Sequence, residues 1–296
     1  KEKMMGTIKK SNLPNLIYRG KVRDTHDLGD DKFLMVATDR ISVFDVVLPT
    51  AIANKGVVLN QISSFWFSKT SQIVPNHLIN LAESQPDLNL DHEYVKRSMV
   101  VKKAKRIDVE CVVRGYITGS AWSEYKSQGT VSGIPVKNKL VEGDTFTEPI
   151  FTPTTKADVG HDENMSYKEV EDLVGVDVAA NLKNLTLSVY KFAHDYALSK
   201  DIIIADTKME FGFINDQIHL IDELLTPDSS RFWDANGYAP GKSQPNFDKQ
   251  FVRDYTNSLG WDHEPPAPEL PDEIVEKTTT RYLNAYKRLT GSTLEL

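Results

Sequence analysis

Polar and apolar residues alternate most regularly between residues 202 and 224, and this pattern predicts a β-hairpin. Two β-like runs, Ile202–Phe213 and Gln217–Leu224, flank the turn signal Asn215-Asp216. The charged residues of the first run occupy every second position: Asp206, Lys208 and Glu210. Because successive side chains of a strand point to opposite faces, these charges are expected to share one face. Such a face is costly to bury unless it meets water, a metal ion or a phosphate, so it is a candidate site.

The segment after the second run is rich in acidic, hydroxyl and guanidinium groups. Asp222 and Glu223 come first, and the loop Pro227-Asp228-Ser229-Ser230-Arg231 follows. Hydroxyl and guanidinium donors suit a phosphate group. A solvated sheet face with an ordinary turn is the alternative interpretation, and the crowding of acids beside one lysine and the S-S-R loop weighs against it.

Apolar-rich runs bounded by turn signals predict that the first third of the chain is mainly β-structure. These runs are Leu16–Asp24, Lys32–Thr38, Ile41–Val47, Ser98–Ala104 and Ile107–Ile117. One helix, Val58–Thr70, interrupts them, because its apolar residues recur with helical spacing. The segments 75–91 and 148–155 are interpreted as a polar connection and a proline-bearing stretch.

The strongest helical periodicity predicts a long amphipathic helix that packs on a sheet. Its apolar residues are Val178, Leu182, Leu185, Val189, Phe192 and Tyr196. Ser166 and Glu169 have the spacing of a capping box and predict the start of another helix. Ser120 is a candidate cap for a short helix that stops at Gly129. Two more helices are predicted, near Asp248–Ser258 and from Asp272 to Leu289, the last ending at Gly291.

The order of these elements predicts an α+β fold. An N-terminal antiparallel β-rich domain comes first and a mixed α/β domain follows, with a cleft between them. The boundary is predicted near residue 105, which gives the domains 1–105 and 106–296. A chain of 296 residues is long enough to bury a large core in two packed domains.

Composition narrows the classes of function. The net charge of −7 and the pI near 5.6 argue against non-specific binding to nucleic acid or to an anionic membrane. No apolar stretch approaches the ~20 residues that span a bilayer, and the first residues lack the apolar segment of a signal peptide. The single cysteine, Cys111, is interpreted as a buried structural thiol, which fits a cytoplasmic location.

Other segments carry candidate anion-binding residues. Gly20 admits a ligand close to the backbone and Lys21 supplies a point charge for a polyphosphate, although no Walker motif is present. Arg114 and Ser120 suit a phosphate or carboxylate at a helix start, and a strand-end arginine paired with a structural carboxylate is the alternative. The polar loop at 156–164 contains His161 and several acids; it fits a substrate-closing loop better than a metal site, because no second histidine has ligand spacing.

Six blocks, in order from residue 18 to residue 233, resemble the phosphoribosylaminoimidazole-succinocarboxamide synthase (SAICAR synthetase) family of purine biosynthesis. The blocks are Y-R-G-K-V-R-D, A-T-D-R-I-S-V-F-D, E-C-V-V-R-G-Y-I-T-G-S, K-A-D-V-G-H-D-E-N, D-T-K-M-E-F-G and I-D-E-L-L-T-P-D-S-S-R-F-W. The pair E-C-V-V-R-G and P-D-S-S-R-F-W is very specific. The length and the C-terminal segment W-D-H-E-P-P-A-P-E-L-P resemble the longer, fungal-type form of the family.

The resemblance implies an ATP-dependent ligase whose fold is like that of ATP-grasp enzymes and kinases. Such an enzyme joins L-aspartate to carboxyaminoimidazole ribonucleotide (CAIR) and releases SAICAR, ADP and phosphate. Phosphoryl transfer from ATP to the carboxylate of CAIR gives an acyl phosphate, which the amine of aspartate attacks. The expected partners are these small molecules, with no nucleic acid and no membrane, and the protein is expected to be a cytoplasmic monomer.

The resemblance also assigns roles to residues. Lys208, Glu210 and Asp222 are expected to be catalytic: the lysine neutralises the reacting carboxylate or its acyl phosphate, and the two acids hold Mg²⁺, which prefers hard oxygen ligands. The residues expected around ATP are Gly20, Lys21, Lys103, Glu210 and Asp222. The residues expected around CAIR or aspartate are Asp45, Arg114, Ser120, Asp162, Lys208, Ser230 and Arg231.

A shared magnesium ion sets a condition on the hairpin. Glu210 and Asp222 share a face if Ile214 pairs with Ile218 across a three-residue loop, whereas a two-residue turn at 215–216 would move Asp222 to the opposite face.

Two other functions stay open. A small-molecule kinase would release a phosphorylated product without an amino acid, and a nucleotide sensor would bind without reacting.

Overall fold

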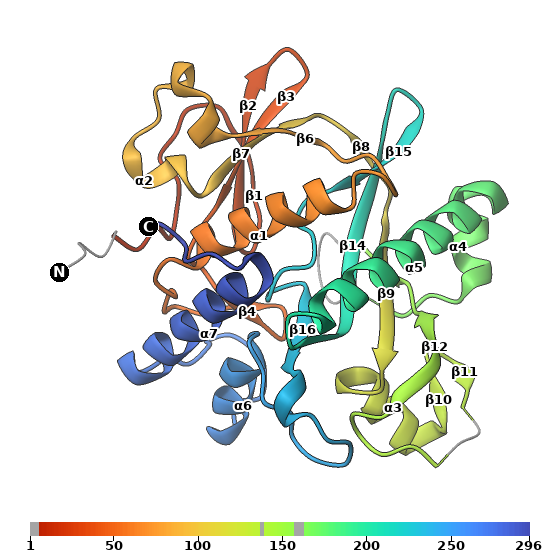
Figure 1. The fold of residues 1–296 in the computed structure, drawn as a ribbon. Coiled ribbons are helices and arrows are strands. Elements are labelled where there is room, and N and C mark those ends of the chain that lie inside the picture. Colours follow the sequence, from red (N-terminus) through yellow and green to blue (C-terminus); the bar gives the residue numbers. More distant parts are fainter. Residues whose placement is uncertain (1–5, 137–138, 157–162) are drawn as a thin grey trace.

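The computed structural model of the protein describes residues 6–136, 139–156 and 163–296. Its first sheet has five antiparallel strands in the order β1-β2-β3-β7-β6. The strands are β1 (Leu16–Arg19), β2 (Arg23–Gly29), β3 (Lys32–Ala37), β7 (Ser98–Lys102) and β6 (Leu78–Leu81). A separate two-stranded hairpin, β4 (Ser42–Val43) with β5 (Val46–Val47), precedes the helix α1 (Lys55–Lys69). Figure 1 shows α1 running between the first sheet and the C-terminal helix α7 (Asp272–Thr290).

The second sheet is organised around one long strand, β14 (Ile202–Ile214). This strand is longer than each of its neighbours, so several strands pair antiparallel along its length. The neighbours are β9 (Val109–Tyr116), β15 (Gln217–Ile221), β16 (Ser230–Asp234) and β8 (Lys105–Arg106). The strands β12 (Thr145–Phe151) and β13 (Thr154–Thr155) pair with β9.

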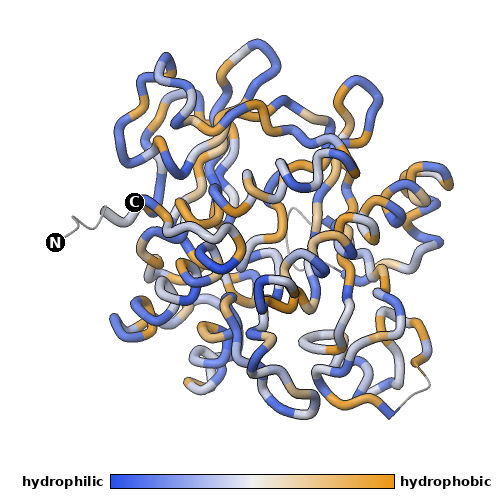
Figure 2. The backbone as a smooth tube through the Cα atoms, viewed as in Figure 1, coloured by the Kyte–Doolittle hydropathy of each residue, from blue (hydrophilic) through white to orange (hydrophobic). Residues whose placement is uncertain are grey.

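Helices cover this sheet and fill the space between the two sheets (Figure 1). The helix α5 (Val176–Leu198) packs on β14 and β9, with Leu182 and Val189 fully buried. The remaining helices are α2 (His92–Val95), α3 (Gly119–Gln128), α4 (Tyr167–Val174) and α6 (Gln250–Ser258), and the short strands β10 (Thr130–Val131) and β11 (Ile134–Pro135) form a small hairpin. The largest apolar cluster contains residues of both sheets, α1, α5 and α7. Figure 2 shows these apolar segments gathered toward the middle of the molecule.

Several predictions of local structure are confirmed. The long amphipathic helix is α5, and the chain has the α+β composition that the element order predicted. The capping box is present, with Ser166 accepting a hydrogen bond from the amide of Glu169 and the Glu169 carboxylate accepting one from the amide of Ser166. The last helix ends at Gly291, which has a left-handed backbone with φ of 76°. The division at residue 105 stays a prediction; the first sheet ends at Lys102 and the second begins at Lys105.

Two segments for which no strand was predicted contain strands, and the interpretation of 75–91 as a polar connection is wrong in part. The strand β6 lies in the segment 75–91, and β12 with β13 occupies most of 145–155. Both β6 and β12 lie at the edges of their sheets, and their pairings are irregular. An edge strand needs hydrogen bonds on one side alone, so it tolerates proline and polar residues that hide it from pattern analysis.

The hairpin register that would place Glu210 and Asp222 on one face is not the one observed. Ile214 pairs with Gln217, so the connection is a two-residue turn in which Asn215 and Asp216 both have left-handed backbones, with φ of 50° and 58°. Two such residues are the signature of a tight hairpin turn that matches the twist of the strands. In this register Glu210 lies opposite Ile221.

Candidate active site

One face of the second sheet carries the charged residues of β14 together with partners from β9. Asp206 accepts a hydrogen bond from Arg114 at 3.1 Å, and Lys208 donates one to Glu110 at 3.0 Å. Asp206 lies opposite Arg114 in the register, so even-numbered residues of both strands point to the same side. The shared face predicted for Asp206, Lys208 and Glu210 is therefore confirmed.

Glu110 is a buried carboxylate between two lysines. Its side chain is 4% exposed and accepts hydrogen bonds from Lys208 and, at 2.8 Å, from Lys156. Lys156 also donates to Glu210 at 2.6 Å, so one ammonium group joins both acids. Burial raises the pKa of Glu110, but the charges of Lys208 and Lys156 outweigh burial and lower it overall. Sequence analysis gave no role to Glu110, although its even spacing from Arg114 was a signal that it shares this face.

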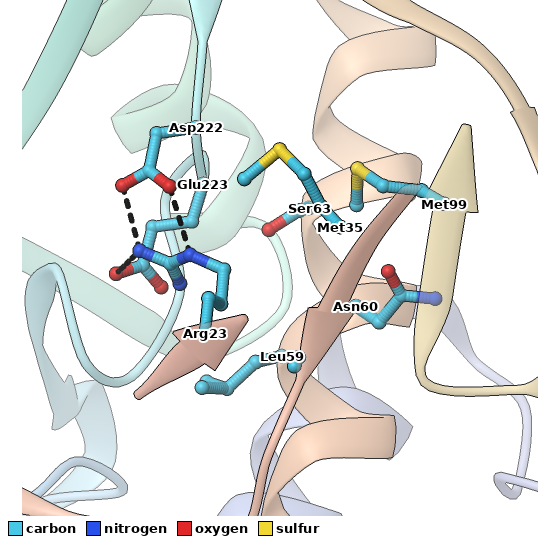
Figure 3. A pocket seen from close by; sticks show the side chains of 9 residues that line it. Arg23, Met35, Leu59, Asn60, Ser63, Met99, Asp222 and Glu223 are labelled. Carbon is cyan, nitrogen blue, oxygen red and sulfur yellow. Dashed lines mark hydrogen bonds and ion pairs between the residues drawn. The ribbon is translucent and has the colours of Figure 1, made fainter. Parts of the chain in front are cut away.

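Asp222 is gripped by Arg23 from the first sheet (Figure 3). The two hydrogen bonds, from Nε to Oδ1 and from Nη2 to Oδ2, measure 2.8 and 2.6 Å, and Arg23 also donates to Glu223 at 3.1 Å. Arg23 is therefore a half-buried ion-pair partner. Because Asp222 has a left-handed backbone with φ of 63°, the chain leaves the strand alternation directly after Ile221. The negative charge of Asp222 still raises the pKa of Glu210.

The pair of Glu210 and Asp222 suits a magnesium ion chemically. Burial and the negative charge of Asp222 raise the pKa of Glu210 to about 6, although Lys156 opposes this. Two carboxylates that repel each other across a shared space are stabilised by a cation, and magnesium takes one or two protein carboxylates with water and phosphate oxygens. Among the described residues no cluster of three or more His, Cys, Asp or Glu side chains fits a metal ion. A magnesium ion on this pair would thus depend on oxygens from ATP and water.

Arg114 and Arg231 meet on opposite sides of Asp206. Arg231 donates from Nη1 to the same Oδ2 atom of Asp206 that Arg114 contacts. The Arg231 guanidinium lies directly over Gly119: a Cβ atom there would come within 2.2 Å of its Nη2 atom. A side chain at Gly119 would displace this guanidinium, and the left-handed backbone with φ of 58° also favours glycine, a constraint that sequence analysis missed. Arg114 does pair with a carboxylate, as the alternative interpretation expected, and that carboxylate also orients Arg231.

Two serines complete this group. Ser120 accepts a hydrogen bond from Arg114 at 3.3 Å, and Ser230 contacts the hydroxyl of Thr207 at 2.8 Å. The prediction that Ser120 caps a helix is wrong, because Thr118 is the capping position and Ser120 lies in the first turn of α3. The structure thus links Arg114, Ser120 and Arg231 through Asp206, whereas Ser230 precedes Arg231 in β16 and contacts Thr207 on the other face of β14; we call Arg114, Ser120, Ser230 and Arg231 the arginine clamp.

The other residues expected around ATP, Gly20, Lys21 and Lys103, lie next to strands of the first sheet. Lys21 forms an ion pair of 2.5 Å with Asp45, and Gly20 makes the turn before β2 through a 2.7 Å hydrogen bond to the carbonyl of Arg23. Asp45 is thereby placed beside an ATP candidate. Lys103 pairs with Asp27 near the other end of β2. Asp162 lies outside the described residues. In the part of the chain that the structure describes, no helix is long and apolar enough to cross a membrane.

Comparison with known proteins identifies the family. A family model described as SAICAR synthetase matches residues 16–268. A phosphoribosylaminoimidazole-succinocarboxamide synthase of Thioalkalivibrio sulfidiphilus is 52% identical, covering 95% of this chain and 96% of its own. One of Geobacter sulfurreducens is 50% identical, covering 97% and 99%.

Solved structures agree with this result. SAICAR synthase of Saccharomyces cerevisiae in complex with SAICAR is 42% identical, with a TM-score of 0.86 and coverage of 99% of this chain and 100% of its own. A SAICAR synthetase in complex with ADP is 26% identical, with a TM-score of 0.71 and coverage of 94% and 99%.

The expectation of a longer, fungal-type form is not supported. Bacterial relatives match over nearly their whole length at about half identity, so neither the length nor the C-terminal segment marks a fungal protein. The family model matches most of the chain, and the relatives match it over nearly their full length. The chain therefore belongs to the SAICAR synthetase family.

Proposed function

We propose that the charged face of β14 is the place where this chain carries out the reaction of its family. The chain is an ATP-dependent ligase of purine biosynthesis, which joins L-aspartate to CAIR and releases SAICAR, ADP and phosphate. ATP use has support from the related structure in complex with ADP. Magnesium, the individual residue roles, the two-domain division, a monomeric state and a cytoplasmic location remain predictions.

One observation carries the proposal: Lys208 and the arginine clamp belong to one hydrogen-bonded unit. The backbone amide of Lys208 donates to the carbonyl of Ser229 at 3.0 Å, and Ser230 with Arg231 follows immediately. Asp206, two residues from Lys208 on the same face, holds Arg231. A ribonucleotide whose phosphate lies on the clamp would therefore lie close to Lys208.

The chemistry required is the activation of a carboxylate, whose oxide is a poor leaving group. Phosphorylation of that carboxylate provides a leaving group, and the protein contributes positioning and charge stabilisation. Lys208 is placed to offset the charge on the carboxylate as it becomes an acyl phosphate. Burial lowers the pKa of Lys208, but Glu110 raises it overall, so the ammonium stays protonated. Glu210 and Asp222 would hold magnesium, which would neutralise phosphate charge when bound.

Lys21 and Asp45 are proposed to serve the ATP side. Their ion pair is exposed, with side chains 50% and 39% accessible, so Lys21 can exchange Asp45 for a phosphate at little cost. Lys103, Gly20 and Asp162 keep their predicted roles as contacts to ATP or substrate without direct support.

The test is ADP release with CAIR, measured with and without L-aspartate. A ligase forms SAICAR only when aspartate is present, and ADP is released in equal amount. A phosphorylated product that accumulates without aspartate would favour a kinase instead. Binding of ATP and CAIR without any ADP release would favour a sensor.

A further inference from the structure

Asp228 lies inside the protein, two residues before the clamp residue Ser230. Its side chain is 3% exposed, and its carboxylate meets groups from two distant parts of the chain. Oδ2 lies 2.6 Å from Nζ of Lys55, and Oδ1 accepts a hydrogen bond of 2.7 Å from the hydroxyl of Tyr282. Lys55 begins α1 and Tyr282 lies in α7, and both are fully buried.

The electrostatics of this group keep Asp228 ionised. Burial raises the pKa of Asp228, but the charge of Lys55 opposes burial most strongly and, with Lys249, brings the value down to about 2. A buried carboxylate with an ammonium on one oxygen and a hydroxyl donor on the other has little freedom to turn, because every displacement weakens a contact that water cannot replace.

Lys55 is itself fixed by the first sheet. The amide of the next residue, Gly56, donates to Asp39 at 2.9 Å, and Arg97 donates to the same oxygen at 2.9 Å. A Cβ atom on Gly56 would come within 2.1 Å of the carbonyl oxygen of Ala37, so the start of α1 is pressed against β3. The position of the Lys55 ammonium, and with it the position of the Asp228 carboxylate, therefore depends on the position of the first sheet.

The loop from Thr226 to Arg231 passes this constraint on to the clamp. The hydroxyl of Thr226 accepts hydrogen bonds of 3.2 Å from the amides of Asp228 and Ser229, which makes a compact turn. The carbonyl of Ser229 binds the amide of Lys208. A shift of the Asp228 carboxylate would thus move the two clamp residues that follow it.

We propose that Lys55 and Tyr282 are positioning residues for the ribonucleotide, acting through Asp228 on Ser230 and Arg231. This inference rests on the proposed function of the clamp. Neither residue reaches the substrate, and each holds one oxygen of the carboxylate that sets the loop. Misplacement of binding groups by about 1 Å can reduce turnover by about 100-fold, so a modest release of the loop is measurable.

The first test removes one hydroxyl. Tyr282→Phe keeps the ring in α7 and deletes the donor to Asp228. The matched control is Tyr196→Phe, which removes a hydroxyl that donates to the carbonyl of Leu289 in the same helix, away from the loop. We expect the KM for CAIR to rise about tenfold in Tyr282→Phe and less than about twofold in the control, with the KM for ATP unchanged in both.

The second test replaces both members of the Lys55–Asp228 ion pair together. The double variant Lys55→Met with Asp228→Leu exchanges the pair for apolar side chains, a change that folded proteins often accept. We expect a cooperative thermal melt, a rise of about tenfold or more in the KM for CAIR, and an unchanged affinity for ATP. If this variant fails to melt cooperatively, Tyr282→Phe alone decides.

A folded Tyr282→Phe with unchanged KM for CAIR would overturn the inference, and so would an equal loss of affinity for CAIR and ATP. The wild-type protein is assayed in parallel for aspartate-dependent SAICAR formation. Failure of that reaction would contradict the proposed function itself, whereas an active wild type with unaffected variants contradicts the positioning role alone.

Discussion

The two sides of the proposed site are built in opposite ways. On the β14 face, the side chains of Asp206 and Glu110 are 6% and 4% exposed, and each binds two cations. On the first-sheet side, Lys21 and Asp45 form a pair whose side chains are 50% and 39% exposed.

The difference shows which part is set in advance and which can adjust. Buried ion pairs have lost the solvent that would screen them, so breaking one leaves an uncompensated charge and is strongly unfavourable. An exposed pair contributes about 0.2–1 kcal/mol and is weakened by salt. The side assigned to the ribonucleotide is therefore preorganised, while the side assigned to ATP can exchange its protein partner for phosphate oxygens.

The largest expected effect comes from Lys208→Met, which keeps the length of the stem and deletes the charge. Turnover should fall by about 100-fold or more, because charge on the acyl phosphate is no longer offset, while ATP affinity changes much less. Steady-state rates and ATP titration measure this, with the exposed Lys168→Met as control. Near-normal turnover in a folded Lys208→Met would mean that this lysine only screens Glu110.

Arg231→Lys tests whether geometry matters on the preorganised side. Lysine keeps the charge but loses the planar fork that contacts Asp206 and lies against Gly119. We expect affinity for CAIR to fall about tenfold with little change for ATP, measured by calorimetry with each ligand. Equal weakening of both ligands would place Arg231 in another subsite.

Lys21→Met tests the adjustable side. The KM for ATP should rise severalfold, while the melting temperature stays within about 2 °C of wild type, because the exposed pair adds little to folding. Lys277→Met removes the lysine of another exposed pair, with Glu273, and is the matched control for stability. A large loss of stability in Lys21→Met would contradict the contrast between the two sides.

The smallest effect on catalysis is expected from Asp24→Asn. Asp24 is a buried residue of β2, on the side assigned to ATP. Burial raises the pKa of Asp24, but hydrogen bonds from Ser11 and Arg40 lower it overall. A lowered folded-state pKa means that ionised Asp24 stabilises the protein above the unfolded value of about 3.9, and that this is lost as pH falls further. The difference in melting temperature between wild type and variant should therefore shrink from pH 7 to about pH 3. A constant difference would show that Asp24 acts without its charge.

Periodicity in the sequence was enough to find the elements that carry the site. The even spacing of Asp206, Lys208 and Glu210 determined that they share a face, because a strand alternates its side chains whatever surrounds it. The helical period of α5 and the capping box at Ser166 were readable for the same reason: each depends on residues within one or two turns. Edge strands such as β12 were not predicted, because their pattern of polar and apolar residues depends on a single neighbouring strand.

The partners of those charges were decided by the tertiary structure. Arg23 and Asp222 are 199 residues apart, and Lys208 and Glu110 are 98 apart, so no local pattern joins them. Asp222 has a left-handed backbone directly after β15, so the alternation along the strand does not by itself fix the direction of its side chain. A sequence determines which residues lie on one face of an element, whereas the pairing of distant elements determines which charges meet, since that pairing is set by packing of the whole core.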